Sequence, residues 1–206
     1  MTLRMKPHTL KKLVCLAAAA ISSLGAQDLT ITNARIIGPN GSVIERGSIV
    51  VRGGKIASVA SGAPSAASGT TIDAKGMTAM PGFIDGHRHI NTGPNEKAQM
   101  QALLEAGYTT VLSGGGPAEG NIALRDHIDK GLINGPRIIP SGSLRLNNNT
   151  PDSARAEIRK MAAMGIKFTG EIALTPIPGP SEKELEVLRA VVDEAKRLAS
   201  SSRFMP

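Results

Sequence analysis

A repeated order of glycine, short apolar run and small-residue loop is the feature that most constrains how this chain can fold. The repeats are GYTTVLSGGG from Gly107, GPRIIPSGSL from Gly135 and GIKFTGEIAL from Gly165, spaced 28 and 30 residues apart. Helical stretches precede them at 96–106, 122–130 and 152–164. Strands that alternate with helices in this way form parallel sheets. With residues 80–90 as a first strand, the sequence predicts an α/β fold of four βα units, in a barrel or a doubly wound sheet.

Two of the predicted helices carry start signals. Thr150-Pro151 suits a helix start, because proline is favoured at the first helical position. Ser181 and Glu184 have the spacing of a capping box. After the second start, an apolar stripe is predicted at Leu185, Leu188 and Val192.

Residues 27–79 predict a separate small β subdomain. The runs LTITNARIIG and SVIERGSIVVRGGKIASV read as short strands, with turn signals at Pro39-Asn40-Gly41 and Gly53-Gly54-Lys55. A further strand is predicted at 70–73, after a loop of small residues.

The first 26 residues have the layout of a secretory signal. Four basic residues without an acidic one precede the apolar run Leu13–Leu24, and the small residues Gly25 and Ala26 follow it. The run is too short to span a bilayer well. The sequence therefore predicts export to the periplasm or the medium, with no stable membrane span after cleavage. An uncleaved N-terminal anchor or a disordered tail is the alternative interpretation.

Charge, cysteine content and loop composition exclude several classes of function. Without residues 1–26 the chain carries 20 basic and 17 acidic residues, with no basic cluster of the kind that binds nucleic acid. Its single cysteine, Cys15, lies in the signal segment, which excludes disulfide frameworks and thiolate zinc sites. No phosphate-binding glycine motif follows a predicted strand, and Gly114-Gly115-Gly116 is interpreted as a flexible loop.

The stretch MPGFIDGHRHI, residues 80–90, contains the candidate metal ligands. In an extended strand Asp85, His87 and His89 point to the same side. Two neutral imidazoles on one side of a strand end can bind one divalent ion, and the carboxylate can ligate it or hold a ligand in place. The alternative is a strand end with surface histidines and a turn aspartate. Of the other histidines, His127 is predicted to face solvent from its helix.

With its context, IDAKGMTAMPGFIDGHRHI, this stretch resembles the metal-dependent amidohydrolase superfamily. GIKFTGEIALTP is similar to the fourth strand of imidazolonepropionase- and Xaa-Pro dipeptidase-like members. The resemblance implies the N-terminal half of a (β/α)8 TIM-type barrel over residues 80–199, beside a small β-sandwich. It implies metal-dependent hydrolysis of amide-type C–N bonds in a small substrate, a dipeptide or a cyclic amide. His87 and His89 would be metal ligands, with Asp85 supporting them.

The same resemblance implies a bridging ligand on the fourth strand, a carboxylated lysine or a glutamate. Lys167 and Glu171 share one face of that strand by parity. Glu171 lies nearer the C-terminal end, where barrel active sites lie, and needs no modification to act as an oxygen ligand. We expect Glu171 to be the ligand, with Lys167 as the alternative, and zinc as the metal, with one or two ions in the complete enzyme.

The sequence departs from the family in its length. A complete barrel needs about 250 residues, whereas 127 remain from Met80, and residues 200–206 read as an irregular tail. The aspartate that would shuttle a proton is expected beyond residue 206. We therefore expect an incomplete chain that is inactive alone and able to self-associate. The alternative is a non-catalytic half-barrel or metal-binding remnant that needs a partner to complete its site.

Overall fold

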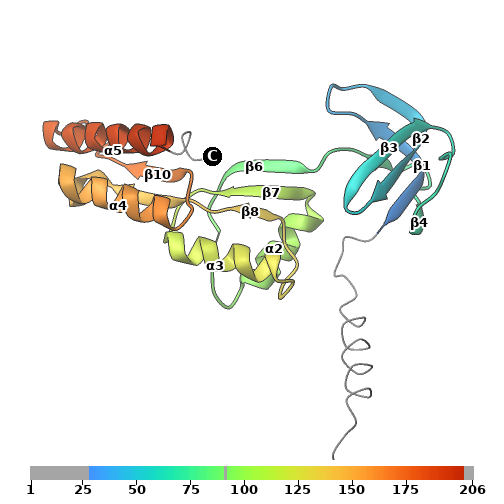
Figure 1. The fold of residues 1–206 in the computed structure, drawn as a ribbon, viewed down its shortest axis with the longest axis horizontal. Coiled ribbons are helices and arrows are strands. Elements are labelled where there is room, and N and C mark those ends of the chain that lie inside the picture. Colours follow the sequence, from blue (N-terminus) through green and yellow to red (C-terminus); the bar gives the residue numbers. More distant parts are fainter. Residues whose placement is uncertain (1–27, 91, 202–206) are drawn as a thin grey trace, which may run out of the picture. The chain divides into compact units, whose positions relative to one another are not determined.

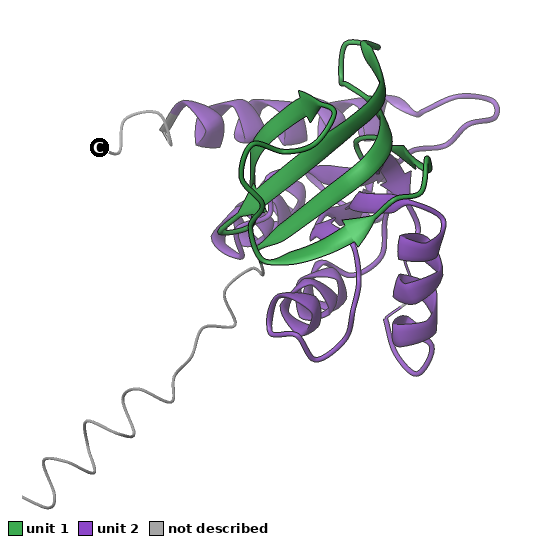
Figure 2. Ribbon diagram, turned by 90° about the vertical axis from the view of Figure 1, so that its right-hand side faces the viewer, with its two compact units in different colours: residues 1–81 green, residues 82–206 purple. Residues whose placement is uncertain are grey.

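The computed structural model describes residues 28–90 and 92–201 (Figure 1). The chain divides into two compact units between Pro81 and Gly82, coloured green and purple in Figure 2. The predicted signal at 1–26 lies outside the described residues. Within the described ranges, no helix is both long and apolar enough to cross a membrane.

The described strands of unit 1 form one sheet of five strands. They are β1 (Leu29–Ile37), β2 (Val43–Arg52), β3 (Lys55–Ser61), β4 (Thr70–Asp73) and β5 (Thr78–Ala79). The order is β3-β2-β1-β4, and β5 also pairs with β1. Gly53 and Gly54 make the β2–β3 turn with φ of 54° and 73°, which glycine adopts without strain. The predicted strands and turns are confirmed, whereas a second layer that would make this sheet a sandwich is not.

Unit 2 is built on parallel strands, as the βα repeats predict. The strands are β6 (Phe83–Arg88), β7 (Tyr108–Ser113), β8 (Arg137–Ile139), β9 (Gly142–Arg145) and β10 (Thr169–Ala173). β6, β7 and β8 form one parallel sheet in that order, and β9 pairs in parallel with β10. Pro140 and Ser141 separate β8 from β9, so the run that begins at Gly135 supplies a strand to each sheet.

Helices lie beside these strands (Figure 1), and two of the apolar groups join them to the strands. The helical elements are α2 (Glu96–Glu105), α3 (Ala118–Asp129), the short η1 (Leu146–Asn148), α4 (Pro151–Ala163) and α5 (Glu182–Ser201). The first group joins α2 and α3 to β7 and β8 through Met100, Leu103, Leu124, Val111 and Ile138. The second joins α4 and α5 to β9 through Ile158, Val187, Val191 and Leu144. Burial of these side chains fixes which face of each strand points to the helices.

The helix starts form as predicted. Thr150 caps α4, and its hydroxyl oxygen accepts a hydrogen bond from the backbone N–H of Ser153 at 3.2 Å, with Pro151 in the first position. Ser181 and Glu184 form the predicted capping box of α5. α5 continues to Ser201 and so includes the first two residues of the predicted irregular tail.

The predicted apolar stripe of α5 is confirmed only in part. Leu188 is partly buried and packs on the α4–α5 group, whereas Val192 is 39% exposed. Val187 and Val191, which are 0% and 3% exposed, carry the contact with α4. Several apolar faces are available on this helix, and packing against β9 and α4 selects the one that contains Val187 and Val191. Sequence periodicity alone could not distinguish these overlapping faces.

Candidate metal centre

Two histidines lie at the C-terminal end of β6. His87 belongs to the strand and His89 is the first residue beyond it. Their ring centroids are 5.4 Å apart, and the ring planes form an angle of 68°. Both side chains are open to solvent, with exposed fractions of 53% and 65%. The strand end therefore presents two accessible imidazoles side by side.

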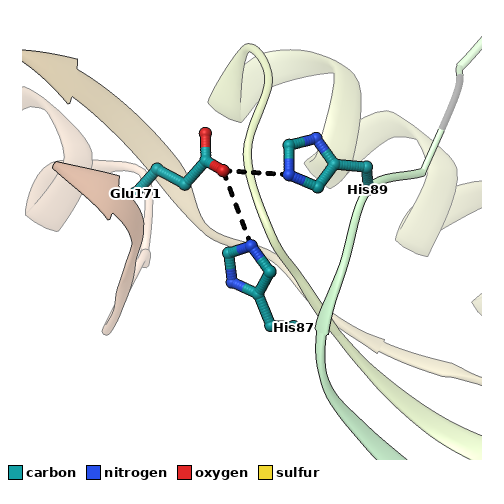
Figure 3. A group of neighbouring side chains, drawn as sticks. All are labelled: His87, His89 and Glu171. Carbon is teal, nitrogen blue, oxygen red and sulfur yellow. Dashed lines mark hydrogen bonds and ion pairs between the residues drawn. The ribbon is translucent and has the colours of Figure 1, made fainter. Parts of the chain in front are cut away.

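Glu171 reaches the same place from β10. Its neighbour Ile172 packs on the α4–α5 group, so alternation along the strand turns Glu171 to the opposite face. Oε1 of Glu171 lies 2.9 Å from Nε2 of His89 and 3.5 Å from Nε2 of His87 (Figure 3). One ligand-type atom from each of the three residues lies within 4.8 Å of the others. Residues 82 positions apart thus converge on one point.

This donor set fits a divalent metal ion. Neighbouring ligands of a tetrahedral zinc ion are about 3.4 Å apart, given metal–ligand bonds of about 2.0–2.2 Å. Of the two separations from Glu171 Oε1, the 3.5 Å to His87 agrees with that spacing, whereas the 2.9 Å to His89 is the length of a direct hydrogen bond. Catalytic zinc sites use three protein ligands and leave one position open, and two histidines with a glutamate are one such set. The solvent exposure of all three side chains matches an open site rather than a closed structural one.

The other two predicted site residues, Asp85 and Lys167, are placed differently from each other. Asp85 does not contact the imidazole rings; its Oδ1 accepts a hydrogen bond from the backbone N–H of His87 at 3.1 Å. Lys167 precedes β10 and lines a cavity of 690 Å³ with Phe168, Ala195 and Leu198, between α4 and α5. The structure therefore brings Glu171 to the histidines and leaves Lys167 elsewhere.

His127 is partly open to solvent, as predicted, with 42% of its side chain exposed. The prediction missed its partner: Nδ1 lies 2.8 Å from Oε1 of Glu96, so the ring joins α3 to the start of α2. Sequence periodicity placed it on an exposed helix face, and the partner, 31 residues away, gave no local signal.

A glycine segment lies directly against the three ligand-type side chains. Gly114 and Gly115, which follow β7, are both buried. A Cβ atom added at Gly114 would lie 2.9 Å from Nε2 of His87, and one at Gly115 would lie 2.8 Å from Oε2 of Glu171. The interpretation of this segment as a flexible loop missed that role. The position of three glycines immediately after a strand was the available signal, because glycine permits close backbone approach.

The chain that follows β10 is held by Glu184. Oε1 of Glu184 accepts hydrogen bonds from the backbone N–H and the hydroxyl of Thr175, both at 2.8 Å. The backbone N–H of Ser181 and these bonds from Thr175 stabilise the carboxylate and lower the pKa of Glu184 to about 2. Thr175 lies two residues beyond the strand that carries Glu171, so this buried carboxylate fixes the strand's exit to the start of α5.

Comparison with known proteins gives relatives by sequence. No protein-family model matches the chain. It is 28% identical over 158 residues to an enamidase from Eubacterium barkeri, which covers 68% of this chain and 40% of the relative. It is 38% identical over 86 residues to a dihydroorotase from Elusimicrobium minutum, which covers 39% of this chain and 20% of the relative. The chain therefore spans less than half the length of these curated relatives.

A solved structure shares the fold. A protein from Bifidobacterium longum, provisionally described as a prolidase, superposes with a TM-score of 0.68 and 28% identity. The superposition covers 84% of this chain and 48% of that protein. The mixed α/β prediction is confirmed, and the neighbours are enzymes of the TIM-barrel type.

Proposed function

Since these similarities identify the chain as a relative of the metal-dependent amidohydrolase superfamily, we propose that His87, His89 and Glu171 bind a divalent metal ion. The relatives are amidohydrolases that act on C–N bonds. The complete protein is accordingly a hydrolase of amide-type C–N bonds, in a dipeptide or a cyclic amide.

The convergence of the three side chains is the observation that carries this proposal. β6 supplies two imidazoles and β10 supplies one carboxylate, at ligand-like separations and with open access from solvent. Capping of α5 explains the Glu184 carboxylate, and a bond to the His87 backbone explains Asp85, whereas neither kind of contact explains Glu171. Its carboxylate faces two imidazoles at an exposed strand end, where two neutral rings and one anion suit a cation.

Zinc is the metal that this donor set favours, because imidazole and carboxylate ligands without thiolate suit it. When bound, such an ion lowers the pKa of a water molecule and polarises a carbonyl oxygen. The chain's own contribution is orientation. The Gly114–Gly115 backbone limits the positions that the Glu171 carboxylate and the imidazoles can adopt, and the bond from His87 N–H to Asp85 fixes the end of β6.

We propose that unit 2 corresponds to the first four βα units of a (β/α)8 barrel. Its parallel strands and the C-terminal position of the candidate ligands support this proposal, since barrel active sites lie at that edge. The comparisons cover about half of a related chain. The remaining functions, ligands for a second ion and a carboxylate that moves a proton, then belong to barrel units that the alignment does not include. In this proposal, residues 1–206 bind metal but do not turn over substrate.

Self-association follows from the same proposal. β6 is an edge strand of its sheet, and Ile84 on it is 72% exposed. Unpaired strand edges with apolar side chains invite pairing with another chain. Size-exclusion chromatography over a concentration series should show species larger than the monomer, and Ile84→Lys should reduce them. A concentration-independent monomer would refute this part of the proposal.

The metal site is tested by zinc affinity, measured by competition with a chromophoric chelator. The unchanged chain should bind one zinc ion, and His89→Ala and Glu171→Ala should each abolish stoichiometric binding. Glu186→Ala is the matched control, because Glu186 is an exposed carboxylate on α5 outside the site. Equal affinity in Glu171→Ala and Glu186→Ala would end the assignment. The reaction class is tested separately, by assaying a protein in which further barrel units complete the site against dipeptides and cyclic amides.

A further inference from the structure

Asn121 is a buried polar residue close to the candidate metal centre. It lies in the first turn of α3 and is 2% exposed. The next turn of the helix carries Leu124, which is 0% exposed and belongs to the apolar group with Met100 and Val111. A buried carboxamide in this setting is costly unless its hydrogen bonds are made.

The Asn121 carboxamide joins two strand ends that are distant in sequence. Its Nδ2 donates to the carbonyl oxygen of Gly115 at 3.1 Å and to the carbonyl oxygen of Ser141 at 2.9 Å. Both partners can only accept, so the group between them must be a two-proton donor. Asparagine meets this demand, whereas the nearly isosteric aspartate carboxylate would not. The residue type, and not only its shape, is therefore required here.

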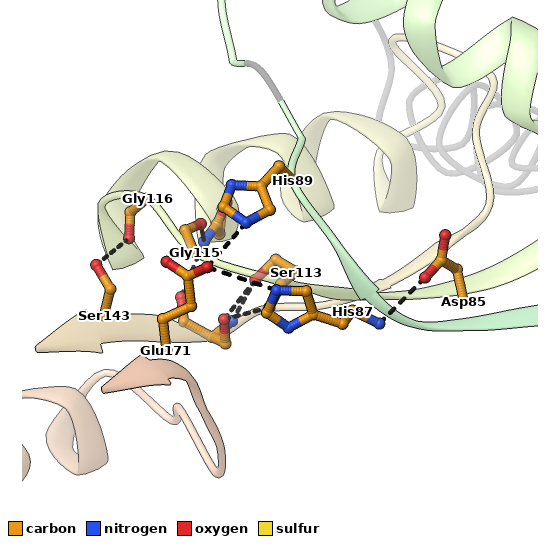
Figure 4. A network of polar contacts seen from close by, with 10 residues as sticks. Asp85, His87, His89, Ser113, Gly115, Gly116, Ser143 and Glu171 are labelled. Atoms are coloured by element: carbon orange, nitrogen blue, oxygen red, sulfur yellow. Dashed lines mark hydrogen bonds and ion pairs between the residues drawn. The ribbon is translucent and has the colours of Figure 1, made fainter. Parts of the chain in front are cut away.

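The strand end at Gly115, after β7, lies against two of the candidate metal ligands. A Cβ atom at Gly115 would approach Oε2 of Glu171 to 2.8 Å and Cε1 of His89 to 3.4 Å. The Gly115 backbone and the Glu171 carboxylate belong to one local network (Figure 4). Movement of the Gly115 carbonyl would therefore change the space available to two of the three ligand-type side chains.

The second strand end holds β10 in place. The Ser141 backbone N–H donates to Oγ of Ser113 at 2.8 Å, and its hydroxyl donates to the Ser113 carbonyl. Gly170, next to Glu171, packs so closely here that an added Cβ would collide with the Ser141 hydroxyl and with the carbonyl oxygens of Ser113 and Gly114. Ser141 thus sets how near β10 comes to β7.

From these contacts we infer that Asn121 is a positioning residue for the metal site. It fixes the Gly115 backbone and the Ser141 strand end together, and through them the placement of Glu171 and His89, without touching any ligand itself. This inference rests on the proposed function of the three-residue site. Loss of a partner that hydrogen-bonds a metal ligand typically costs about 10–100-fold in metal affinity, and we take this range as the expected size of the effect, although Asn121 acts through the backbone.

The test uses the full 206-residue chain with Asn121→Asp and Asn121→Leu, which keep the approximate size of the side chain and remove its donors. Leu124→Ala is the control, since it damages the apolar group on the same helix and removes no hydrogen bond to Gly115 or Ser141. We expect zinc affinity to fall about 10–100-fold in both Asn121 variants and less than threefold in Leu124→Ala. The visible absorption of the cobalt-loaded protein should shift in Asn121→Leu and stay unchanged in Leu124→Ala, because it reports ligand geometry.

Two outcomes separate this inference from the proposed function. If Glu171→Ala abolishes zinc binding while Asn121→Asp and Asn121→Leu retain full affinity and an unchanged cobalt spectrum, the positioning role is refuted and the metal site stands. If the unchanged chain binds no zinc, the metal site is refuted. Hydrogen–deuterium exchange then tests whether Asn121 fixes the Gly115 backbone and the Ser141 strand end. Faster exchange of backbone amides at 113–117 in Asn121→Leu than in Leu124→Ala would support it, and equal exchange would refute it.

Discussion

Gly115→Ala provides a sharp test of the candidate metal centre, because it adds one methyl group against a ligand. The Cβ atom would lie 2.8 Å from Oε2 of Glu171, whereas ordinary contacts begin at about 3.4 Å, so the oxygen must retreat by about 0.6 Å. The φ of Gly115 is not among the positive values that strain other residues. The substitution therefore changes the site without forcing the backbone.

The expected loss of zinc affinity in Gly115→Ala follows from the narrow range of metal–ligand distances that a site tolerates. Metal–ligand distances in protein sites vary by about 0.2 Å, which is less than the displacement that the methyl group requires. We expect zinc affinity to fall about 10–100-fold, or about 1.4–2.8 kcal/mol in binding free energy. The free energy of unfolding should change by less than about 1 kcal/mol. The Glu171 side chain is 41% exposed and can swing aside, and alanine in place of glycine stabilises the chain by about 0.4–1 kcal/mol through the unfolded state.

The assay is chelator competition for zinc beside urea unfolding of the metal-free protein. Gly86→Ala is the matched control, because Gly86 is next to His87 and an added Cβ there meets nothing within 4 Å. It should leave zinc affinity within about twofold of the unchanged chain. The reasoning fails if Gly115→Ala binds zinc as tightly as Gly86→Ala, or if it loses affinity only because it unfolds.

Three further predictions follow from named residues. Glu171→Ala should remove zinc while Lys167→Ala keeps it, measured by elemental analysis; the reverse would favour a carboxylated lysine. The pKa of Glu184 is lowered from 4.5 to about 2, so the unfolded chain takes up this proton first as the pH falls. The free energy of unfolding should therefore decrease from about pH 4.5 to pH 2, and Glu184→Gln should flatten that decrease in acid titrations followed by circular dichroism. Mass spectrometry of exported protein should find a new N-terminus near Gln27, and an intact Met1 on mature soluble protein would contradict the predicted signal.

Local signals in the sequence predicted most of the elements. The parallel order of unit 2, the start of α4 at Thr150 and the capping box at Ser181 depend on residues close together in the chain, and each is confirmed. The boundary of β10 was less predictable. The strand begins at Thr169 rather than just after Gly165. Ile166 is buried against Met161, so the chain at this point packs on α4 instead of pairing in the sheet.

The candidate ligands could be chosen from sequence because strand parity and the end of a parallel strand were combined with the resemblance to the amidohydrolase superfamily. His87, His89 and Glu171 each satisfy both conditions, and the structure brings them together. Lys167 satisfies parity alone, and it lies two residues before β10 begins. Their role as metal ligands stays a prediction until zinc binding is measured.

The support around the ligands could not be predicted in the same way. Asn121 and Ser141 are 20 positions apart, and Ser113 and Ser141 are 28 apart, with no spacing rule that connects them. Asparagine and serine within short βα segments read as ordinary helix or loop residues. Their function follows only from the carbonyl groups they satisfy. Substitutions at such positions should consequently alter metal affinity in proteins whose ligand motif is intact. If Asn121→Leu loses zinc affinity as we propose, an HxH motif with a strand-end glutamate would be an insufficient criterion for this metal site, and the donor at position 121 and the glycines at 114 and 115 would belong in it as well.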